Sequence, residues 1–328
     1  MGMPEQGWPI PRELIDLLSA LRGSVLLLGH VQPDGDLLGS QIGLGLALRN
    51  AGAQVTLAGP QAVPDLFRFL PGAELVEQWE AAPGPFDLVI LGDCPDPSRT
   101  HGLLAGARGV ATRIVNIDHH PDNKRYGDVN WIEGESSATG EMVYDLIQAL
   151  GLKVTPEIAT NLFTAIHTDT GSFRYSNTTP RALRIAGDLV AQGAHPELVA
   201  GALYEGRKPD DLWRLGSLLG QVEVSPDGLV AWLALPHGSV PEAFVEAEDL
   251  VTYPRSIASV KVAVLLREAA AGRVKVSLRA KGEVNVGKIA AAFGGGGHAN
   301  AAGCTIAGSL EEARAALLRS VSEALGKR

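Results

Sequence analysis

The sequence predicts an α/β protein with two domains. The N-terminal domain should hold a mostly parallel five-stranded sheet flanked by helices, and a smaller α/β C-terminal domain should hold a mixed sheet. Three observations predict this class. Short apolar runs alternate with helical patterns through the first half of the chain. These runs are continuous, as expected where helices cover both faces of a sheet. The length of 328 residues allows two separate cores.

The N-terminal elements follow from these patterns in order. The first strand is predicted at 24–28, where Val25 to Leu28 form an unbroken apolar run. The following helix, at 39–50, has small residues along one side. The same patterns then predict strands at 54–58, 87–91 and 113–117, and helices at 137–151 and 156–168. Right-handed connections between successive strands give a parallel sheet.

The C-terminal half begins after a helical region. Helices are predicted at 180–192, 196–205 and 210–221, ahead of a turn at Pro226-Asp227-Gly228. Beyond the turn we expect strands at 229–235, 261–267 and 273–280, and helices at 286–293 and 310–325. The predicted division is a domain at 1–192, a helical linker at 193–227 and a domain at 228–328, with a catalytic cleft between the two domains.

Composition limits the classes of function. The chain is 45% hydrophobic and 20% charged, which is ordinary for a soluble globular protein. No apolar run is long enough to span a bilayer, and no secretory signal opens the chain, so we expect a cytoplasmic protein without a membrane partner. The two cysteines, Cys94 and Cys304, form no CxxC pair and are expected to be reduced.

Charge is unevenly distributed. A formal net charge of −9 argues against a protein that binds long nucleic acids through many phosphate contacts. From Arg267 to Lys288, however, the sequence has six basic and two acidic residues, a local net charge of +4. This segment suits a small anionic ligand.

Side chains that can bind metal follow four of the predicted apolar segments. They are His30, Asp34 and Asp36 after the first strand, Asp93 after strand 87–91, Asp118, His119 and His120 after strand 113–117, and Asp169 after helix 156–168. Because the carboxyl ends of parallel strands meet at one edge of a sheet, we expect these groups to converge. Their convergence predicts a site for a pair of divalent cations.

Such a pair indicates phosphate-ester hydrolysis. These esters hydrolyse very slowly in water, so a catalyst must lower a high barrier. Two cations about 3.5–4 Å apart activate a water and stabilise both the attacking and the leaving oxygen. Carboxylate and imidazole ligands without thiolate favour Mn²⁺, with Mg²⁺ or Co²⁺ as alternatives.

The same motifs carry a family resemblance. His-x-x-x-Asp-x-Asp at 30–36, the strand-end Asp93, Asp118-His119-His120 and the later Asp169 resemble the four motifs of the DHH phosphoesterase superfamily. The segment from Gly294 to Gly303 resembles the glycine-rich signature of the DHH-associated C-terminal domain. The length and the segment from Val276 to Gly282 are similar to the nano-RNase (oligoribonuclease)/pAp-phosphatase branch.

The resemblance implies a role for each motif residue. It implies one cation held by His30, Asp34 and a bridging Asp93. It implies a second cation held by Asp36, Asp93, His119 and Asp169. His120 would contact the scissile phosphate and help protonate the leaving oxygen, and Asp118 would orient an imidazole.

The resemblance also implies an activity and its substrates. The enzyme would be an exonuclease-like phosphodiesterase, in which a metal-bridging water attacks in line and degrades short oligoribonucleotides (nanoRNA) to nucleoside 5′-monophosphates. It would also convert 3′-phosphoadenosine 5′-phosphate (pAp) to AMP. The expected substrate-binding residues are Arg279, Gly295, Gly296, Gly297 and His298, together with Arg99 and Asn123. The glycines would let backbone N–H groups approach a phosphate closely.

Other readings share parts of this pattern. A RecJ-like single-strand DNA exonuclease is disfavoured by the acidic charge, and a family II pyrophosphatase lacks the glycine-rich signature. A soluble phosphodiesterase of cyclic dinucleotides or linear pApA stays open. A nucleotide-binding sensor has no need of a full set of metal ligands. RNA or DNA preference, polarity on longer substrates, the metal in the cell and the oligomeric state, including a homodimer, stay open as well.

Overall fold

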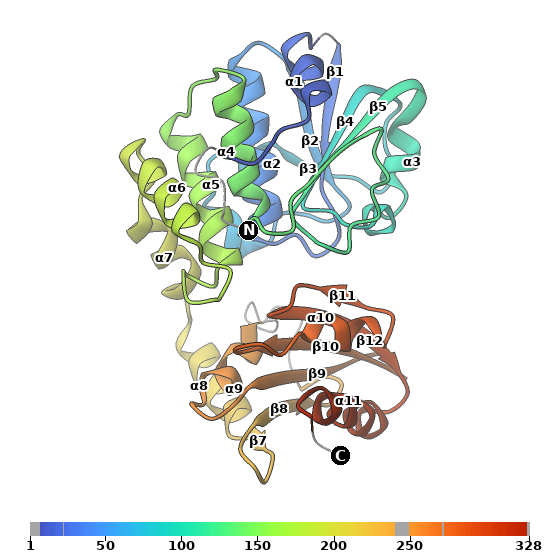
Figure 1. The fold of residues 1–328 in the computed structure, drawn as a ribbon, viewed down its shortest axis with the longest axis vertical. Helices are drawn as coiled ribbons and strands as arrows, with labels where there is room; N and C mark the ends of the chain where they lie inside the picture. Colours follow the sequence, from blue (N-terminus) through green and yellow to red (C-terminus); the bar gives the residue numbers. More distant parts are fainter. Residues whose placement is uncertain (1–6, 22, 240–248, 271, 327–328) are drawn as a thin grey trace. The chain divides into compact units, whose positions relative to one another are not determined.

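The structure is a computed structural model that describes residues 7–21, 23–239, 249–270 and 272–326. The chain divides into two compact units, residues 1–206 and 207–328 (Figure 1). No helix among the described residues is both long and apolar enough to cross a membrane.

The N-terminal unit contains a parallel sheet of six strands in the order β3-β2-β1-β4-β5-β6. The strands are β1 (Ser24–Leu28), β2 (Gln54–Gly59), β3 (Val76–Gln78), β4 (Phe86–Gly92), β5 (Arg108–Asp118) and β6 (Val129–Ile132). The parallel α/β class is confirmed, and the expected number of five strands is one too few. The two edge strands, β3 and β6, have three and four residues and lack a long apolar run, so they gave no clear signal.

Helices cover both faces of this sheet. Alternate residues of β1 enter different cores: Val25 and Leu27 pack on one face, and Leu26 and Leu28 on the other. This two-sided burial explains the unbroken apolar run. The helices of this unit are α1 (Arg12–Ser19), α2 (Gly35–Asn50), α3 (Leu103–Ala107), α4 (Thr139–Ala149), α5 (Pro156–Asp169), α6 (Pro180–Ala191) and α7 (Pro196–Tyr204). Short 3-10 helices lie at η1 (Asp65–Phe67), η2 (Ala73–Leu75) and η3 (Pro97–Thr100).

The C-terminal unit contains a mixed sheet in the order β11-β12-β10-β9-β8-β7. The β8–β9 pair is parallel and the other neighbours are antiparallel. Helices α10 and α11 pack on one face of it, and α8 packs on the other. The strands are β7 (Glu223–Val224), β8 (Val230–Leu235), β9 (Val262–Ala270), β10 (Arg273–Ala280), β11 (Gly296–Gly297) and β12 (Ala301–Ala307). The helices are α8 (Pro209–Leu219), η4 (Asp249–Val251), α9 (Thr252–Ser256), α10 (Val286–Ala291) and α11 (Leu310–Ala324).

The two units meet in sequence at Gly206 and Arg207, inside the segment expected to be a linker. Helices of that segment contribute to the cores on either side of this point. Val199 of α7 is buried in the core of the N-terminal unit, and Leu215 and Leu218 of α8 are buried in a core of the C-terminal unit. The linker boundaries at 193 and 227 and the cleft between the domains stay predictions.

Helices α2 and α5 approach each other through glycines on α2. A Cβ atom added at Gly39 would lie 2.3 Å from the backbone oxygen of Asn161, and one at Gly35 would lie 2.4 Å from Oγ1 of Thr168. Real Cβ atoms do not make contacts this short, so both positions need the absence of a side chain. This close packing brings the N-terminus of α2, with Asp34 and Asp36, near the C-terminus of α5, where Asp169 lies.

We therefore expect Gly39→Ala to lower the free energy of unfolding by about 1–3 kcal/mol, because the new methyl group must displace the backbone of α5. Urea denaturation followed by circular dichroism measures this loss. Gly187→Ala is the matched control, because Gly187 is an exposed position in helix α6 with nothing within 4 Å of an added Cβ. There the change should stabilise by up to about 1 kcal/mol through helix propensity. Equal effects of the two substitutions would contradict the packing argument.

Candidate metal centre

The first group of possible ligands lies just beyond β1. Nδ1 of His30 lies 2.7 Å from the backbone oxygen of Val31 and 3.0 Å from Nη2 of Arg99, so Nε2 is the ring nitrogen left for a cation. Nε2 is buried, has no hydrogen-bond partner among the described residues and lies 3.7 Å from Oδ2 of Asp93. A buried nitrogen lone pair that faces a carboxylate is an arrangement that a cation would satisfy.

Asp34 completes this group from the start of α2. It is the N-cap residue of the helix, and its Oδ1 accepts a hydrogen bond from the backbone N–H of Leu37 at 3.0 Å. One ligand atom each from His30, Asp34 and Asp93 lies within 4.8 Å of the others. These three residues can therefore hold one cation.

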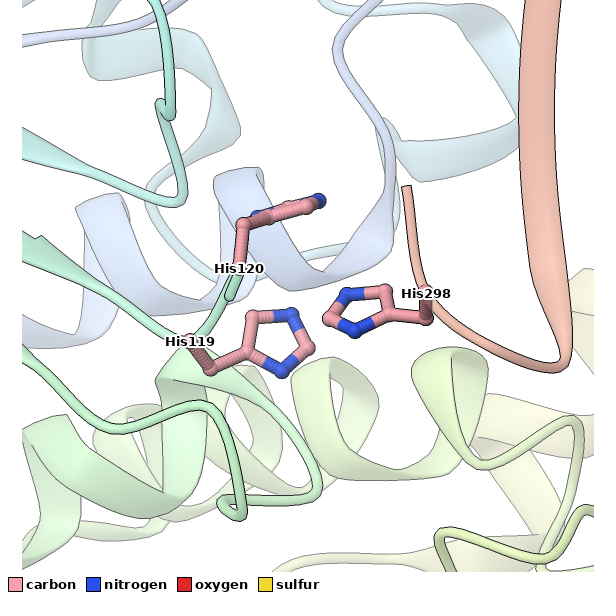
Figure 2. Close-up of side chains that lie close together, drawn as sticks. All are labelled: His119, His120 and His298. Atoms are coloured by element: carbon pink, nitrogen blue, oxygen red, sulfur yellow. The ribbon is translucent and has the colours of Figure 1, made fainter. Parts of the chain in front are cut away.

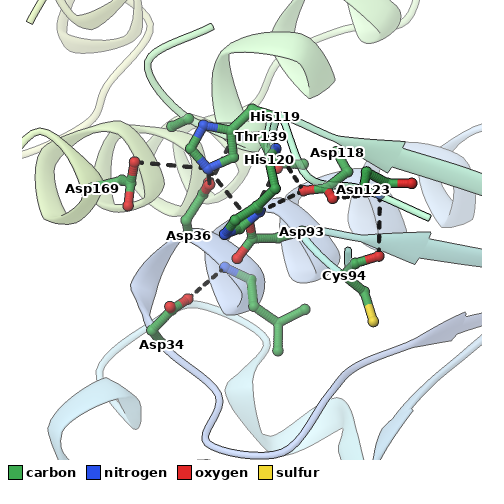
Figure 3. A network of polar contacts seen from close by, with 12 residues as sticks. Asp34, Asp36, Asp93, Cys94, Asp118, His119, His120, Asn123, Thr139 and Asp169 are labelled. Carbon is green, nitrogen blue, oxygen red and sulfur yellow. Dashed lines mark hydrogen bonds and ion pairs between the residues drawn. The ribbon is translucent and has the colours of Figure 1, made fainter. Parts of the chain in front are cut away.

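The second group surrounds His119 at the end of β5 (Figure 3). Its Nε2 lies 3.4 Å from Oδ2 of Asp36, 3.4 Å from Oδ1 of Asp93 and 3.7 Å from Oδ2 of Asp169. Nδ1 of His119 lies 3.2 Å from the backbone oxygen of Ser136, which leaves Nε2 for the carboxylate side. One ligand atom each from Asp36, Asp93 and His119 lies within 4.8 Å of the others, so these three residues can hold a cation, and Asp169 lies beside the same imidazole nitrogen.

Asp93 is shared between the two groups. Its Oδ2 faces His30, and its Oδ1 faces His119. The backbone of Asp93 is left-handed, with φ 54°, and its N–H donates to the backbone oxygen of Ile117 at 3.0 Å. This conformation is uncommon outside glycine, and strained residues of this kind gather at functional sites.

The carboxylates of this centre perturb one another. Burial, followed by the charge of Asp93, raises the pKa of Asp36 well above its ordinary value. Burial also raises the pKa of Asp169 to about 6. Burial favours protonation of Asp93 too, but the imidazoles of His119 and His30 prevail and hold its pKa well below the ordinary value. Crowded oxygen donors with two imidazoles match the preferences of a divalent cation.

His120 lies beside His119 and also faces Asp93, with its Nδ1 3.4 Å from Oδ1 of that residue. The rings of His119 and His120 meet edge to face, with centroids 4.9 Å apart and an interplanar angle of 68° (Figure 2). Nδ1 of His120 lies 2.8 Å from Oδ1 of the fully buried Asp118. Burial lowers the pKa of His120, but Asp118 outweighs this effect and raises it to about 9. Without a bound cation, this raised pKa favours the protonated form of His120 at neutral pH.

Two further candidates of the N-terminal unit, Asn123 and Arg99, lie beside these groups. Nδ2 of Asn123 donates to Oδ2 of Asp118 at 2.5 Å and to Oδ1 of Asn116 at 2.8 Å, so Asn123 holds the carboxylate that holds His120. Nη2 of Arg99 lies 3.0 Å from Nδ1 of His30. Their contacts with substrate stay predictions.

Other residues of the centre had no functional signal in the sequence. Thr139 donates from its backbone N–H to Asp36 at 2.7 Å and from its hydroxyl to Asp93 at 3.3 Å. In sequence, Thr139 only marks the start of a helix, which capping alone would explain. Nδ2 of Asn177 donates to the backbone oxygen of Asp169 at 3.1 Å. No pattern in the sequence singles out Asn177.

The glycine-rich segment of the C-terminal unit is closely packed. An added Cβ at Gly295 would lie 2.1 Å from the backbone oxygen of Gly303, and one at Gly297 would lie 2.7 Å from that of Ala301. The N–H groups of Gly295 and His298 donate to the backbone oxygens of Ala290 and Ala301. Packing against β12 thus explains Gly295 and Gly297, and phosphate binding by Gly295, Gly296, Gly297 and His298 stays a prediction.

Arg279 lies beside this segment, near the end of β10. Its strand neighbour Ala301 belongs to the glycine-rich segment, and the N–H of Ala280 donates to the backbone oxygen of Asn300 at 2.9 Å. Nε of Arg279 is buried and has no hydrogen-bond partner among the described residues. This guanidinium N–H could donate a hydrogen bond to an anion such as a phosphate.

Comparisons with known proteins agree with these two units. The model of the DHH family N-terminal domain matches residues 24–166, and that of the DHHA1 domain matches residues 244–327. The chain is 37% identical to the bifunctional oligoribonuclease and PAP phosphatase NrnA of Thermus thermophilus, over 97% of this chain and 95% of that protein. It is 29% identical to the protein of the same name in Bacillus subtilis, over 90% and 92%. An exopolyphosphatase-related protein from Bacteroides fragilis has the same fold, with a TM-score of 0.81, 25% identity and coverage of 96% and 95%.

We expect Mn²⁺ to stabilise the folded chain. At a free concentration 100 times Kd, a ligand of the native state adds about 2.7 kcal/mol, which corresponds to a rise in Tm of about 5–10 °C for a unit of this size. Differential scanning calorimetry of the EDTA-treated chain with and without Mn²⁺ measures the rise. His119→Gln should reduce it, and His195→Gln, at an exposed position, should not. An equal rise in both variants would contradict the assignment of His119.

Proposed function

Because this chain belongs to the DHH family and carries a DHHA1 domain after its DHH domain, we propose that it is a metal-dependent hydrolase of phosphoric esters. Its proposed substrates are short single-stranded oligoribonucleotides, which it degrades to nucleoside 5′-monophosphates, and pAp, which it converts to AMP. The names of its relatives support this substrate class. The observation that carries the proposal is the pair of ligand groups that share Asp93.

The centre suits two divalent cations, for which we propose Mn²⁺. Bound there, they would neutralise phosphate oxygens and activate a water as the nucleophile. His30, Asp34 and Asp93 would hold one cation, and Asp36, Asp93, His119 and Asp169 would hold the other. The oxygen-rich donor set with imidazoles supports Mn²⁺ over a structural zinc site.

The proposed role of His120 is general acid. Asp118 holds its Nδ1, so the proton that can leave is on Nε2. A group with a pKa near 9 is protonated at neutral pH and can donate to the oxygen of the departing nucleoside. Asn123 supports this arrangement because it fixes the second oxygen of Asp118.

The C-terminal unit is proposed to hold the other end of the substrate. Arg279 can bind a phosphate with two parallel N–H groups, and the basic excess from Arg267 to Lys288 attracts an anion to this unit. A short ligand with a phosphate group is the kind of substrate that this arrangement suits. The two free cysteines, Cys94 and Cys304, fit the reducing cytoplasm proposed as its location.

Asp93→Asn should lower kcat on a labelled diribonucleotide by at least about 10³-fold, because the neutral amide cannot bridge two cations. Release of mononucleotide with Mn²⁺, followed by thin-layer chromatography, measures this loss. Asp65→Asn is the control, since Asp65 forms an exposed pair with Arg68. Near-normal turnover by the Asp93→Asn variant would contradict the proposal that Asp93 is a ligand of both cations. A wild-type chain that binds the dinucleotide but releases no product with any divalent cation would overturn the enzymatic proposal.

Arg279→Ala should raise KM for the dinucleotide by about 10–100-fold with a smaller change in kcat, because a charge-assisted hydrogen bond contributes about 1.5–3 kcal/mol. Initial rates over a range of substrate concentrations separate the two constants. Lys275 is exposed on the same strand. If the net positive charge of this segment is unimportant for binding, Lys275→Ala should leave KM within about two-fold of the wild-type value. The same increase in both variants would point to general electrostatics rather than to a specific contact.

A further inference from the structure

We propose that Glu141, paired with Arg181, positions the ligands of one of the two cations through the turn at 136–140. Both are positioning residues, because they act on the metal ligands through this turn. The inference deepens the proposed function, since it concerns the same centre. Its test, however, is the binding of the metal itself.

The turn contacts three of the four ligands proposed for the second cation. The N–H groups of Thr139 and Gly140 donate to Oδ2 and Oδ1 of Asp36 at 2.7 and 2.9 Å. The hydroxyl of Thr139 donates to Asp93 at 3.3 Å, and the backbone oxygen of Ser136 lies 3.2 Å from Nδ1 of His119. A shift of the turn would therefore move three ligands together.

The fourth ligand is connected through one amide. Nδ2 of Asn177 donates to the backbone oxygen of Ser137 at 3.1 Å. The same nitrogen donates to the backbone oxygen of Asp169 at 3.1 Å and lies 3.4 Å from its Oδ2. Asp169 is thus also fixed relative to the turn, although it belongs to a different helix.

Glu141 fixes the turn through Ser137. Its Oε2 accepts hydrogen bonds from the hydroxyl of Ser137 at 2.6 Å and from the backbone N–H of Ser137 at 3.3 Å. Its Oε1 accepts from Nε of Arg181 at 2.8 Å and from Nε1 of Trp8 at 2.9 Å. Glu141 is fully buried, and loss of these partners would leave an uncompensated charge in the protein interior at a high cost in free energy. The position of Ser137 is therefore determined by a saturated, buried carboxylate.

The ligands that belong only to the first cation have other anchors. The ring of His30 is oriented by the backbone oxygen of Val31, and Asp34 is oriented by the N–H of Leu37. Neither anchor is part of the turn. A change at Glu141 should therefore lower the affinity for one cation more than the affinity for the other.

Asp145 provides a matched control one helical turn later in α4. It forms an ion pair with Nη2 of Arg181 and accepts from the backbone N–H of Trp8 at 3.1 Å. It thus belongs to the same buried cluster as Glu141, but its two partners, Trp8 and Arg181, lie outside the turn. A purely structural role of the cluster predicts that Asp145→Asn and Glu141→Gln have the same effect on metal binding.

The experiment titrates Mn²⁺ into the EDTA-treated full-length chain by isothermal titration calorimetry. It compares wild type with Glu141→Gln, Ser137→Ala and Asp145→Asn. Glu141→Gln and Ser137→Ala should weaken one of two binding events by about 10-fold or more and the other by less, because partners behind the ligands tune metal affinity by this amount. Asp145→Asn should lower Tm and leave both affinities within about two-fold. Dinucleotide turnover by Glu141→Gln at limiting Mn²⁺ should be low and should recover with excess Mn²⁺.

Three results would overturn the inference. They are equal losses of Mn²⁺ affinity in Glu141→Gln and Asp145→Asn, unchanged affinity in Ser137→Ala, and a wild-type chain that binds no Mn²⁺. If Glu141→Gln does not fold, Ser137→Ala still decides, since it removes only one hydroxyl. A wild-type chain that binds two Mn²⁺ with the expected order of variants but hydrolyses no dinucleotide would refute the proposed function and leave this inference intact.

Discussion

Three carboxylates, Asp36, Asp93 and Asp169, lie within 3.4–3.7 Å of a single imidazole nitrogen at one edge of the N-terminal sheet. Their mutual repulsion is the constraint that the surrounding structure must balance, because unpaired charge in a protein interior is costly. Each carboxylate consequently has its own hydrogen-bond donors. Two backbone N–H groups donate to Asp36, a threonine hydroxyl donates to Asp93, and Nδ2 of Asn177 lies 3.4 Å from Oδ2 of Asp169. Oδ2 of Asp36, Oδ1 of Asp93 and Oδ2 of Asp169 also face Nε2 of His119, so a divalent cation there would bind lone pairs of both oxygen and nitrogen.

This balance depends on close approach between helices. The glycines of α2 bring its N-terminus against α5, and Gly140 at the start of α4 has Ala165 of α5 only 2.5 Å from the place of an added Cβ. Bulkier residues would separate the elements that carry Asp36, Asp169 and the N–H donors. The small residues in the core thus have the same purpose as the polar ones at the edge, since both kinds keep the ligands at bonding distance.

The sequence was sufficient for those parts that depend on local pattern. Strand β1 has the predicted bounds, because an apolar run between polar residues has one interpretation. The strand-end acids and histidines converge, because parallel strands share an edge. Residues whose role depends on tertiary contact could not be found this way. Asn177 lies in a polar segment without a pattern, and Glu141 reads as an ordinary acid in the first turn of α4. The short strand β3 is too exposed to give an apolar signal.

The left-handed backbone of Asp93 has a practical consequence for capturing the enzyme with its substrate. Asparagine accepts positive φ more readily than most residues and has nearly the same shape as aspartate. Replacement of the carboxylate by its amide should therefore preserve the loop between β4 and η3, whereas alanine or glutamate would release or distort it. The Asp93→Asn chain would keep its other binding groups in place and would lack only the carboxylate proposed to be shared by the two cations. It is accordingly the form best suited to co-crystallisation with an uncleaved dinucleotide.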